Sequence, residues 1–308
     1  MTRDLIVALS GGIGGAKLAL GLSHVVAAQN LVIIANTGDD FDHLGLSISP
    51  DIDTITYTLA GIDNPTLGWG RRDETWSFME TLATIGGPTW FRLGDRDLAL
   101  HIERTRRLRA GETLSTITDD IARHWGIGPR ILPMSNDPVR TRVKTDGGWI
   151  DFQDYFVGQQ CRPVVQELAF AGAASARPHP DILAALASPR LKAVVICPSN
   201  PFISVEPILA VPGIRAAIAK SGAPVIAISP IIGGKAVKGP TAKMMAELGL
   251  EVSAAAVATR YGKLLTHYVL DHVDAGAAVP QTTVLAKTLM TSLQDRIDLA
   301  RATIAAIT

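Results

Sequence analysis

The chain has 308 residues, of which 47% are hydrophobic and 19% are charged, a composition typical of a globular α/β enzyme and not of a disordered or fibrous chain. Its 29 Lys and Arg residues balance 29 Asp and Glu residues, so no global basic field indicates binding to nucleic acid or to an anionic membrane. No apolar run is long enough to cross a bilayer, and Gly11 and Gly12 interrupt the first one, so we expect a cytoplasmic protein without a signal peptide. Cys161 and Cys197 lack the spacing of a metal motif and are expected to be reduced.

A glycine-rich segment near the start of the chain is its most informative feature. An apolar run, Leu5–Leu9, is followed by this segment and then by an apolar pattern of helical period. The segment contains Gly11, Gly12, Gly14, Gly15 and Lys17. Strand, glycine turn and helix together predict a phosphate site, because glycines let the backbone approach the anion and the first N–H groups of the helix point at it.

The segment does not identify the nucleotide. A dinucleotide fingerprint needs a third glycine where Lys17 stands, and a Walker loop needs Ser or Thr where Leu18 stands. A tight turn between strand and helix, without a ligand, is the alternative interpretation.

Three later apolar runs read as strands buried on both faces of a parallel sheet: 31–35, 191–197 and 223–228. Each is followed by a polar loop that contains Gly or Pro. Because ligands bind beyond the carboxyl ends of such strands, we expect these loops to meet the glycine segment in one crevice. The candidate binding residues in them are Asn36, Thr37, Asp39, Ser199, Asn200, Pro201, Ser229, Gly233 and Gly234.

The predicted fold is therefore α/β: a Rossmann-like three-layer sandwich with a mostly parallel central sheet. We predict one catalytic domain over residues 1–308. Residues from about 63 to 126 read as a smaller, largely helical insert that caps the crevice. An antiparallel hairpin is predicted where residues 139–145 and 149–152 flank Asp146-Gly147-Gly148.

Two pairs of acids have both a functional and a structural interpretation. Asp39 and Asp40 end the second predicted strand, where an acid can bind a ribose; solvated loop acids are the alternative. Asp51 and Asp53 follow Ser49 in a segment typical of a helix start, where acids complement the helix dipole. Residues two apart do not share a helix face, so one of this pair is free to reach the crevice.

Arg96 lies in a Gly-Asp-Arg-Asp segment before another helical pattern. Its guanidinium suits two-point binding of a phosphate or carboxylate. The alternative is structural: Asp95 caps the helix, and Arg96 belongs to a solvated basic face that continues through Arg104 and Arg107. No histidine has the spacing of a metal site or a catalytic triad, and no G-x-S-x-G motif is present, so nucleophilic catalysis by Ser or Cys is not expected.

An ordered set of short motifs resembles the 2-phospho-L-lactate transferase family of coenzyme F420 biosynthesis, and it covers nearly the whole chain. The matching segments are Ser10-Gly11-Gly12-x-Gly14, Asn36-Thr37, Ser49-Pro50-Asp51-x-Asp53-Thr54, Leu93-Gly94-Asp95-Arg96-Asp97, Leu132-Pro133-Met134-Ser135, Phe152-Gln153-Asp154, Pro198-Ser199-Asn200-Pro201, Ser229-Pro230-Ile231-Ile232-Gly233 and Thr288-Leu289-Met290-Thr291.

The resemblance implies a Mg²⁺-dependent reaction. The ribitol hydroxyl of the deazaflavin FO would attack the phosphorus of a guanosine-diphospho-activated three-carbon acid and release GMP. It also implies Asp51 at the metal, with Asp53 and Arg96 as further catalytic residues. The glycine segment with Lys17 and the polar loops would then hold the guanosine diphosphate, and a homodimer is expected.

The identity of the three-carbon acid stays open among phospholactyl, phosphoenolpyruvyl and phosphoglyceryl groups. A second hypothesis is a non-enzymatic regulator similar to the nucleotide-sugar-binding gluconeogenesis factors, which resemble this chain in the glycine segment. The segments around Arg96, Met134 and Thr288–Thr291 favour the transferases. A nicotinamide-dependent dehydrogenase is disfavoured by the missing third glycine.

Overall fold

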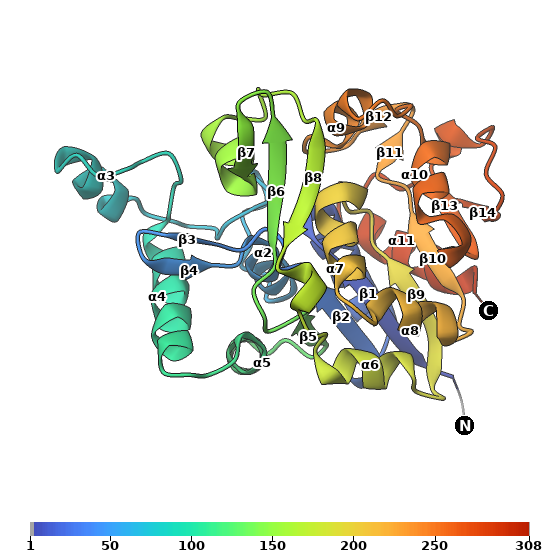
Figure 1. The fold of residues 1–308 in the computed structure, drawn as a ribbon. Helices are drawn as coiled ribbons and strands as arrows, with labels where there is room; N and C mark the ends of the chain where they lie inside the picture. The colour runs from blue at the N-terminus through green and yellow to red at the C-terminus, as the bar shows by residue number, and fades with distance from the viewer. Residues whose placement is uncertain (1–2, 308) are drawn as a thin grey trace.

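The computed structural model describes residues 3–307 and shows a three-layer α/β sandwich (Figure 1). Its centre is a seven-stranded sheet in which every neighbouring pair of strands is parallel. The prediction of a Rossmann-like fold with a parallel central sheet is confirmed. In spatial order, the strands are β14 (Thr282–Leu285), β13 (His267–Leu270), β10 (Val225–Ile228), β9 (Leu191–Ile196), β1 (Leu5–Ser10), β2 (Leu31–Ala35) and β5 (Arg130–Pro133).

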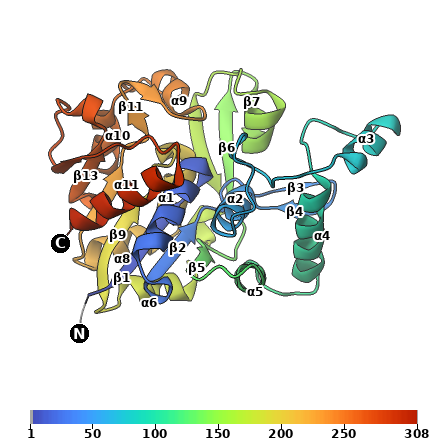
Figure 2. The ribbon, with the colours of Figure 1, turned by 180° about the vertical axis from the view of Figure 1, so that it is seen from behind.

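Helices cover both faces of this sheet, as the two opposite views show (Figures 1 and 2). One face carries α1 (Gly12–Val25), α2 (Pro50–Leu59) and α11 (Leu293–Ala305). The other carries α6 (Pro180–Leu186), α7 (Glu206–Ala210), α8 (Ile214–Lys220) and α10 (Ala254–Tyr261). Strand β1 serves both cores, because Ile6 and Ala8 pack toward α1 while Val7 and Leu9 pack toward the opposite layer. Burial on both faces explains why these strands are continuous apolar runs.

Three small antiparallel sheets extend this framework. Strands β6 (Arg140–Thr145) and β7 (Gly148–Asp151) form the predicted hairpin, and β8 (Glu167–Ala171) pairs with β6. Strands β3 (Phe41–His43) and β4 (Leu46–Ile48) form a short hairpin between β2 and α2. Strands β11 (Ile231–Ile232) and β12 (Lys235–Ala236) pair just before α9 (Thr241–Glu247).

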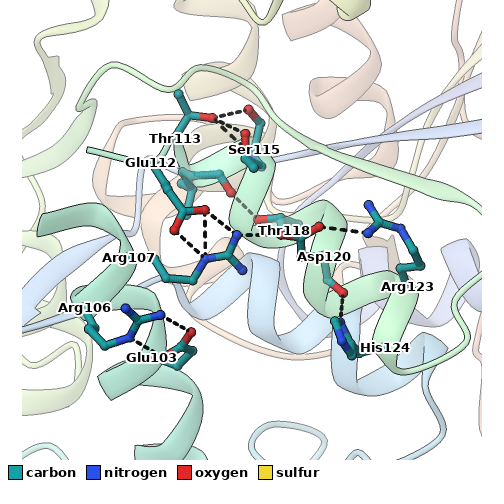
Figure 3. Close-up of polar contacts among 12 residues, drawn as sticks. Glu103, Arg106, Arg107, Glu112, Thr113, Ser115, Thr118, Asp120, Arg123 and His124 are labelled. Atoms are coloured by element: carbon teal, nitrogen blue, oxygen red, sulfur yellow. Dashed lines mark hydrogen bonds and ion pairs between the residues drawn. The ribbon is translucent and has the colours of Figure 1, made fainter. Parts of the chain in front are cut away.

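The region predicted as a helical insert contains α3 (Ser77–Thr84), α4 (Asp95–Arg109) and α5 (Leu114–His124). Figure 1 shows α3 at the end of an arm that points away from the sheet. Figure 3 shows how α4 and α5 are joined: the Arg107 guanidinium donates to Glu112 and, at 2.5 Å, to Asp120 at the middle of α5. The role of this region as a lid stays a prediction. No single helix within residues 3–307 has the length and apolar character needed to span a bilayer.

Candidate active site

The site lies where the order of the parallel strands reverses. From β1 the chain proceeds to β2 and β5 on one side, and later to β9, β10, β13 and β14 on the other. Ligands of open α/β sheets bind at this switch point, beyond the carboxyl ends of the strands. The four loops predicted to converge follow β1, β2, β9 and β10, which are neighbours in the sheet, so their convergence is confirmed.

The loops after β1 and β9 are joined directly. The Gly11 N–H donates to Ser199 Oγ at 3.3 Å, and Ser199 Oγ donates to the Gly11 carbonyl at 2.8 Å. A Cβ at Gly14 would lie 2.2 Å from the Pro198 carbonyl oxygen, and one at Gly15 would lie 2.6 Å from Ser10 Oγ. These glycines are therefore required by close packing between loops. Of the first N–H groups of α1, those of Ile13 and Gly14 are left for an anion.

Asp51 is fixed at the start of α1 by hydrogen bonds to both carboxylate oxygens. Oδ1 accepts the Gly12 N–H at 2.7 Å, and Oδ2 accepts Asn36 Nδ2 at 2.8 Å. Asn36 also donates to the Ile203 carbonyl at 3.1 Å, so its amide links β2, α2 and the loop after β9. Asp51 is only 5% exposed. A residue from the first turn of α2 is thus brought to the carboxyl ends of β1 and β2, as the sequence allowed for one member of the acid pair.

Three buried carboxylates lie here, Asp39, Asp40 and Asp51, and in the part of the chain that the structure describes none of them forms an ion pair. Burial raises the pKa of Asp51 to about 6 and that of Asp40 to about 8. Burial, and after it the charge of Asp51, raises the pKa of Asp39 well above its ordinary value. Within residues 3–307, Oδ1 of Asp39 and Oδ1 of Asp40 have no hydrogen-bond partner. Buried acids in this state indicate a ligand that supplies positive charge or donors.

Two structural expectations for this segment are wrong. Asp39 and Asp40 are not solvated loop acids, because they are 8% and 6% exposed. Ser49 occupies the N-cap position of α2, but its side chain caps no N–H of the helix; Oγ donates to Asp40 Oδ2 at 2.9 Å instead. The hydroxyl therefore serves the acidic centre, since a buried carboxylate that lacks a donor is costly to leave unsatisfied.

Asp53, on the opposite side of α2, is neutralised by Arg104. The two guanidinium nitrogens of Arg104 donate to the two oxygens of Asp53, at 3.1 Å for the longer contact. Arg104 is only 2% exposed, so the expectation of a solvated basic face through Arg104 is wrong. His101 Nδ1 lies 3.7 Å from Asp53, and His101 Nε2 lies 3.6 Å from Asp97. Tyr57 donates to Asp97, which completes a buried network between α2 and α4.

Arg96 is exposed at the start of α4, and within residues 3–307 its guanidinium makes no hydrogen bond or ion pair. Its backbone is fixed on both sides: the N–H donates to Glu74 at 2.8 Å, and the carbonyl accepts from Arg71 at 3.4 Å. Asp95 does not cap α4, because the N-cap is Gly94. Asp95 instead accepts the N–H groups of Ser77 and Phe78, each at 3.0 Å, at the start of α3.

The remaining predicted residues border the same edge of the sheet. Lys17 Nζ donates to the Met290 carbonyl at 3.0 Å, and Thr37 Oγ1 is buried without a partner in the described chain. Asn200 and Pro201 begin a π-helical turn, where Asn200 Oδ1 accepts the Phe202 N–H at 2.9 Å. Ser229, Gly233 and Gly234 form the loop after β10, where the φ angles of Gly233 (56°) and Gly234 (72°) require glycine.

An aromatic cluster beside the acidic centre is the feature that the sequence reasoning missed in part. Phe41 and His43 of β3 meet Trp90 and Phe91, with ring centroids between 4.8 and 6.2 Å apart. His43 Nε2 is buried and has no partner within residues 3–307. Trp90 and Phe91 lie within the region from about 63 to 126 that was predicted to cap the crevice, whereas Phe41 and His43 lie outside it. Their position directly after Asp39 and Asp40 is the signal that would have identified them.

Comparison with known proteins assigns this chain to a family. The model of the 2-phospho-L-lactate transferase CofD family matches residues 6–304. The chain belongs to this family. A phosphoenolpyruvate transferase of Streptomyces griseus subsp. griseus is 48% identical over 278 residues, which cover 88% of this chain and 87% of that protein. One from Kitasatospora aureofaciens is 42% identical and covers 97% of both chains. This CofD-family chain is a transferase of coenzyme F420 biosynthesis.

A solved structure supports the fold independently. The crystal structure of a UPF0052 family member from Bacillus halodurans superposes with a TM-score of 0.62, covering 98% of this chain and 99% of the other. Its sequence identity is 14%, so this likeness concerns the fold alone.

Proposed function

We propose that the protein transfers a phosphoenolpyruvyl group from a guanosine-diphospho-activated donor to the ribitol hydroxyl of FO and releases GMP. The observation that carries this proposal is the acidic centre at the switch point, beside the phosphate-type start of α1. The choice of the three-carbon acid rests on the relatives named phosphoenolpyruvate transferase, which cover 88% to 97% of this chain.

The residues present fit a magnesium ion. Asp39 Oδ1 is buried without a partner in the described residues and lies in the same centre as Asp51. No group of three His, Cys, Asp or Glu side chains within residues 3–307 is arranged to hold a metal alone. This is the pattern of Mg²⁺, which is commonly held by one or two carboxylates together with substrate phosphates and water. Asp51 would hold it together with the substrate phosphates, next to Asp39, and it would withdraw charge from the diphosphate.

Protein side chains then provide positioning and a proton acceptor. The hydroxyl oxygen of FO attacks phosphorus, the bond from phosphorus to the GMP oxygen breaks, and GMP leaves with the electron pair. We assign the hydroxyl proton to Asp39 Oδ1, because both oxygens of Asp51 already accept hydrogen bonds. Asp53 acts through Arg104 by fixing α2, while Arg96 has a free guanidinium for the donor or for FO.

The aromatic cluster suits the acceptor. A flat tricyclic ring gains most from apolar and aromatic walls, and Trp90 is 37% exposed at the edge of the cluster. His43 Nε2 offers a polar partner at the same place. Trp90→Ala should raise KM for FO about tenfold with a smaller change in kcat, in line with about 1–3 kcal/mol for stacking of a base on an aromatic side chain.

The deciding experiment is incubation of the purified protein with FO, Mg²⁺ and each of the three activated donors in turn, with products identified by mass. We expect product and GMP with the phosphoenolpyruvyl donor. A preference for another donor would overturn the choice of acid but not the transfer reaction.

A thermal-shift comparison of GDP with a UDP-sugar tests the class of function. A ligand that binds only the folded state raises its melting temperature. Preferential stabilisation by the UDP-sugar, with no turnover, would favour a nucleotide-sugar-binding regulator.

A further inference from the structure

Three cationic side chains from separate segments gather around α1 without forming an ion pair. They are Lys17 on α1, Lys238 between β12 and α9, and Arg296 on α11. Lys17 Nζ donates to the Met290 carbonyl at 3.0 Å, and Lys238 Nζ donates to the Leu67 carbonyl at 3.1 Å. None of the ion pairs found in residues 3–307 includes any of the three.

Close contacts place the Lys238 ammonium and the backbone of Arg296 along the stripe of α1 that carries Lys17. Ile13, Lys17 and Gly21 are four residues apart and therefore share a helix face. A Cβ at Gly68 would lie 3.3 Å from Ile13 and 2.9 Å from Lys238 Nζ, so Lys238 lies over the first turn of the helix. A Cβ at Gly21 would lie 2.0 Å from the carbonyl oxygen of Arg296, so α11 contacts α1 two turns later. Lys17 lies between these two contacts.

The electrostatics of this stripe favour an anion. Burial, followed by repulsion from Arg296 and Lys238, lowers the pKa of Lys17, and only Asp63 opposes this effect. Arg296 Nε is buried and has no partner in the described chain. Like charges brought together destabilise the folded chain, and the unpaired N–H groups at the start of α1 add to the positive potential. A diphosphate bound there would offset the repulsion between the cations and would accept from the unpaired N–H groups.

We infer that Lys17, Lys238 and Arg296 form the binding site for the diphosphate of the donor, with Lys238 joining residues 64–70 to that site. The inference rests on the proposed function, because the activated donor supplies the diphosphate. It adds two binding residues, Lys238 and Arg296, that lie outside the glycine segment and the loops after the strands. The Arg296 guanidinium can bind two phosphate oxygens at once, and the Lys238 ammonium can bind phosphate as a point charge.

The test is calorimetric titration of GDP and of guanosine into the wild type, Lys238→Gln and Arg296→Gln. Each substitution should weaken GDP about tenfold and leave guanosine unchanged, because guanosine lacks the phosphates. Arg301→Gln is the matched control: Arg301 also lies on α11, is 64% exposed and pairs with Asp298, so GDP affinity should not change. Unchanged melting temperatures verify that the variants fold.

Wild-type GDP affinity in both variants would overturn the anion site while leaving the transfer reaction intact. Equal losses for GDP and guanosine would also overturn it, since the effect would then concern the base or the fold. Inorganic pyrophosphate is the second probe. If the wild type binds pyrophosphate but not GDP, and both variants lose pyrophosphate, the anion site stands and the guanosine donor is wrong.

Discussion

Asp51 and Asp53 are two residues apart on α2, and both are buried, yet their surroundings differ completely. On the side of Asp51, three carboxylates meet amide and hydroxyl donors, and within residues 3–307 none of them forms an ion pair, although Arg140 and Arg104 act on Asp40 from farther away. On the side of Asp53, the carboxylate is matched by Arg104, and the adjoining Asp97 is matched by His101 and Tyr57. A buried carboxylate that is paired within the chain stabilises a helix contact. One that is left unpaired lowers stability and is retained for a ligand.

Removing the charge of Asp51 should have the largest effect on activity. Asp51→Asn preserves the shape but removes a ligand charge, so kcat should fall about 1,000-fold, equivalent to about 4 kcal/mol. The melting temperature should change little, because the removal of a buried charge is offset by the loss of one of the two hydrogen bonds that Asp51 accepts. Activity within a few-fold of the wild type would make Asp51 a helix-start residue only.

Removing the cation that pairs with Asp53 should lower the stability of the fold more than it lowers the rate of transfer. Arg104→Met leaves Asp53 buried without its cation and should destabilise the fold by about 3–5 kcal/mol, measured by denaturant unfolding. The double variant Asp53→Asn with Arg104→Met removes both charges and should recover part of that loss. Equal losses in the single and double variants would show that Arg104 does not act through Asp53.

Substitution of the exposed Arg96 tests whether its guanidinium binds one of the substrates. If its guanidinium binds the donor or FO at two points, Arg96→Lys should lower kcat/KM about tenfold, or about 1.4 kcal/mol. The melting temperature should be unchanged, since the Arg96 side chain has no partner within residues 3–307. Wild-type kinetics would remove Arg96 from the site. Exposed Arg109→Lys, which alters a contact to the Gly45 carbonyl at 2.8 Å, is the control.

Asp40 should make the stability of the fold depend on pH. Its pKa of about 8 in the folded chain exceeds its ordinary value of 3.8, so the folded state holds a proton that the unfolded state loses. This contribution to stability is present at low pH and disappears as the pH rises toward 8. The melting temperature of Asp40→Asn should therefore fall less than that of the wild type between pH 5.5 and pH 8.5. Asp42→Asn, at an exposed neighbour, should keep the wild-type slope.

Much of the framework was predictable because short-range patterns determine it. Continuous apolar runs such as 31–35 predicted buried parallel strands, and Asp146-Gly147-Gly148 predicted the hairpin of β6 and β7. The convergence of four loops followed from the geometry of parallel sheets. Local patterns failed where a side chain bonds to a partner outside its own helix start. Ser49 donates to Asp40 and does not cap α2, and Asp95 accepts from the start of α3 and does not cap α4.

The sequence by itself determined the fold class, the family and the edge of the sheet at which ligands should bind, because periodicity and ordered motifs are local properties. It placed Asp51 and Asp53 together as one acidic pair. Helix geometry already indicated that the two do not share a face, but only the tertiary structure decided which of them pairs with Arg104, because that depends on the packing of α4. The charge state of a carboxylate depends on burial and on partners far away in sequence, and those are decided by the fold.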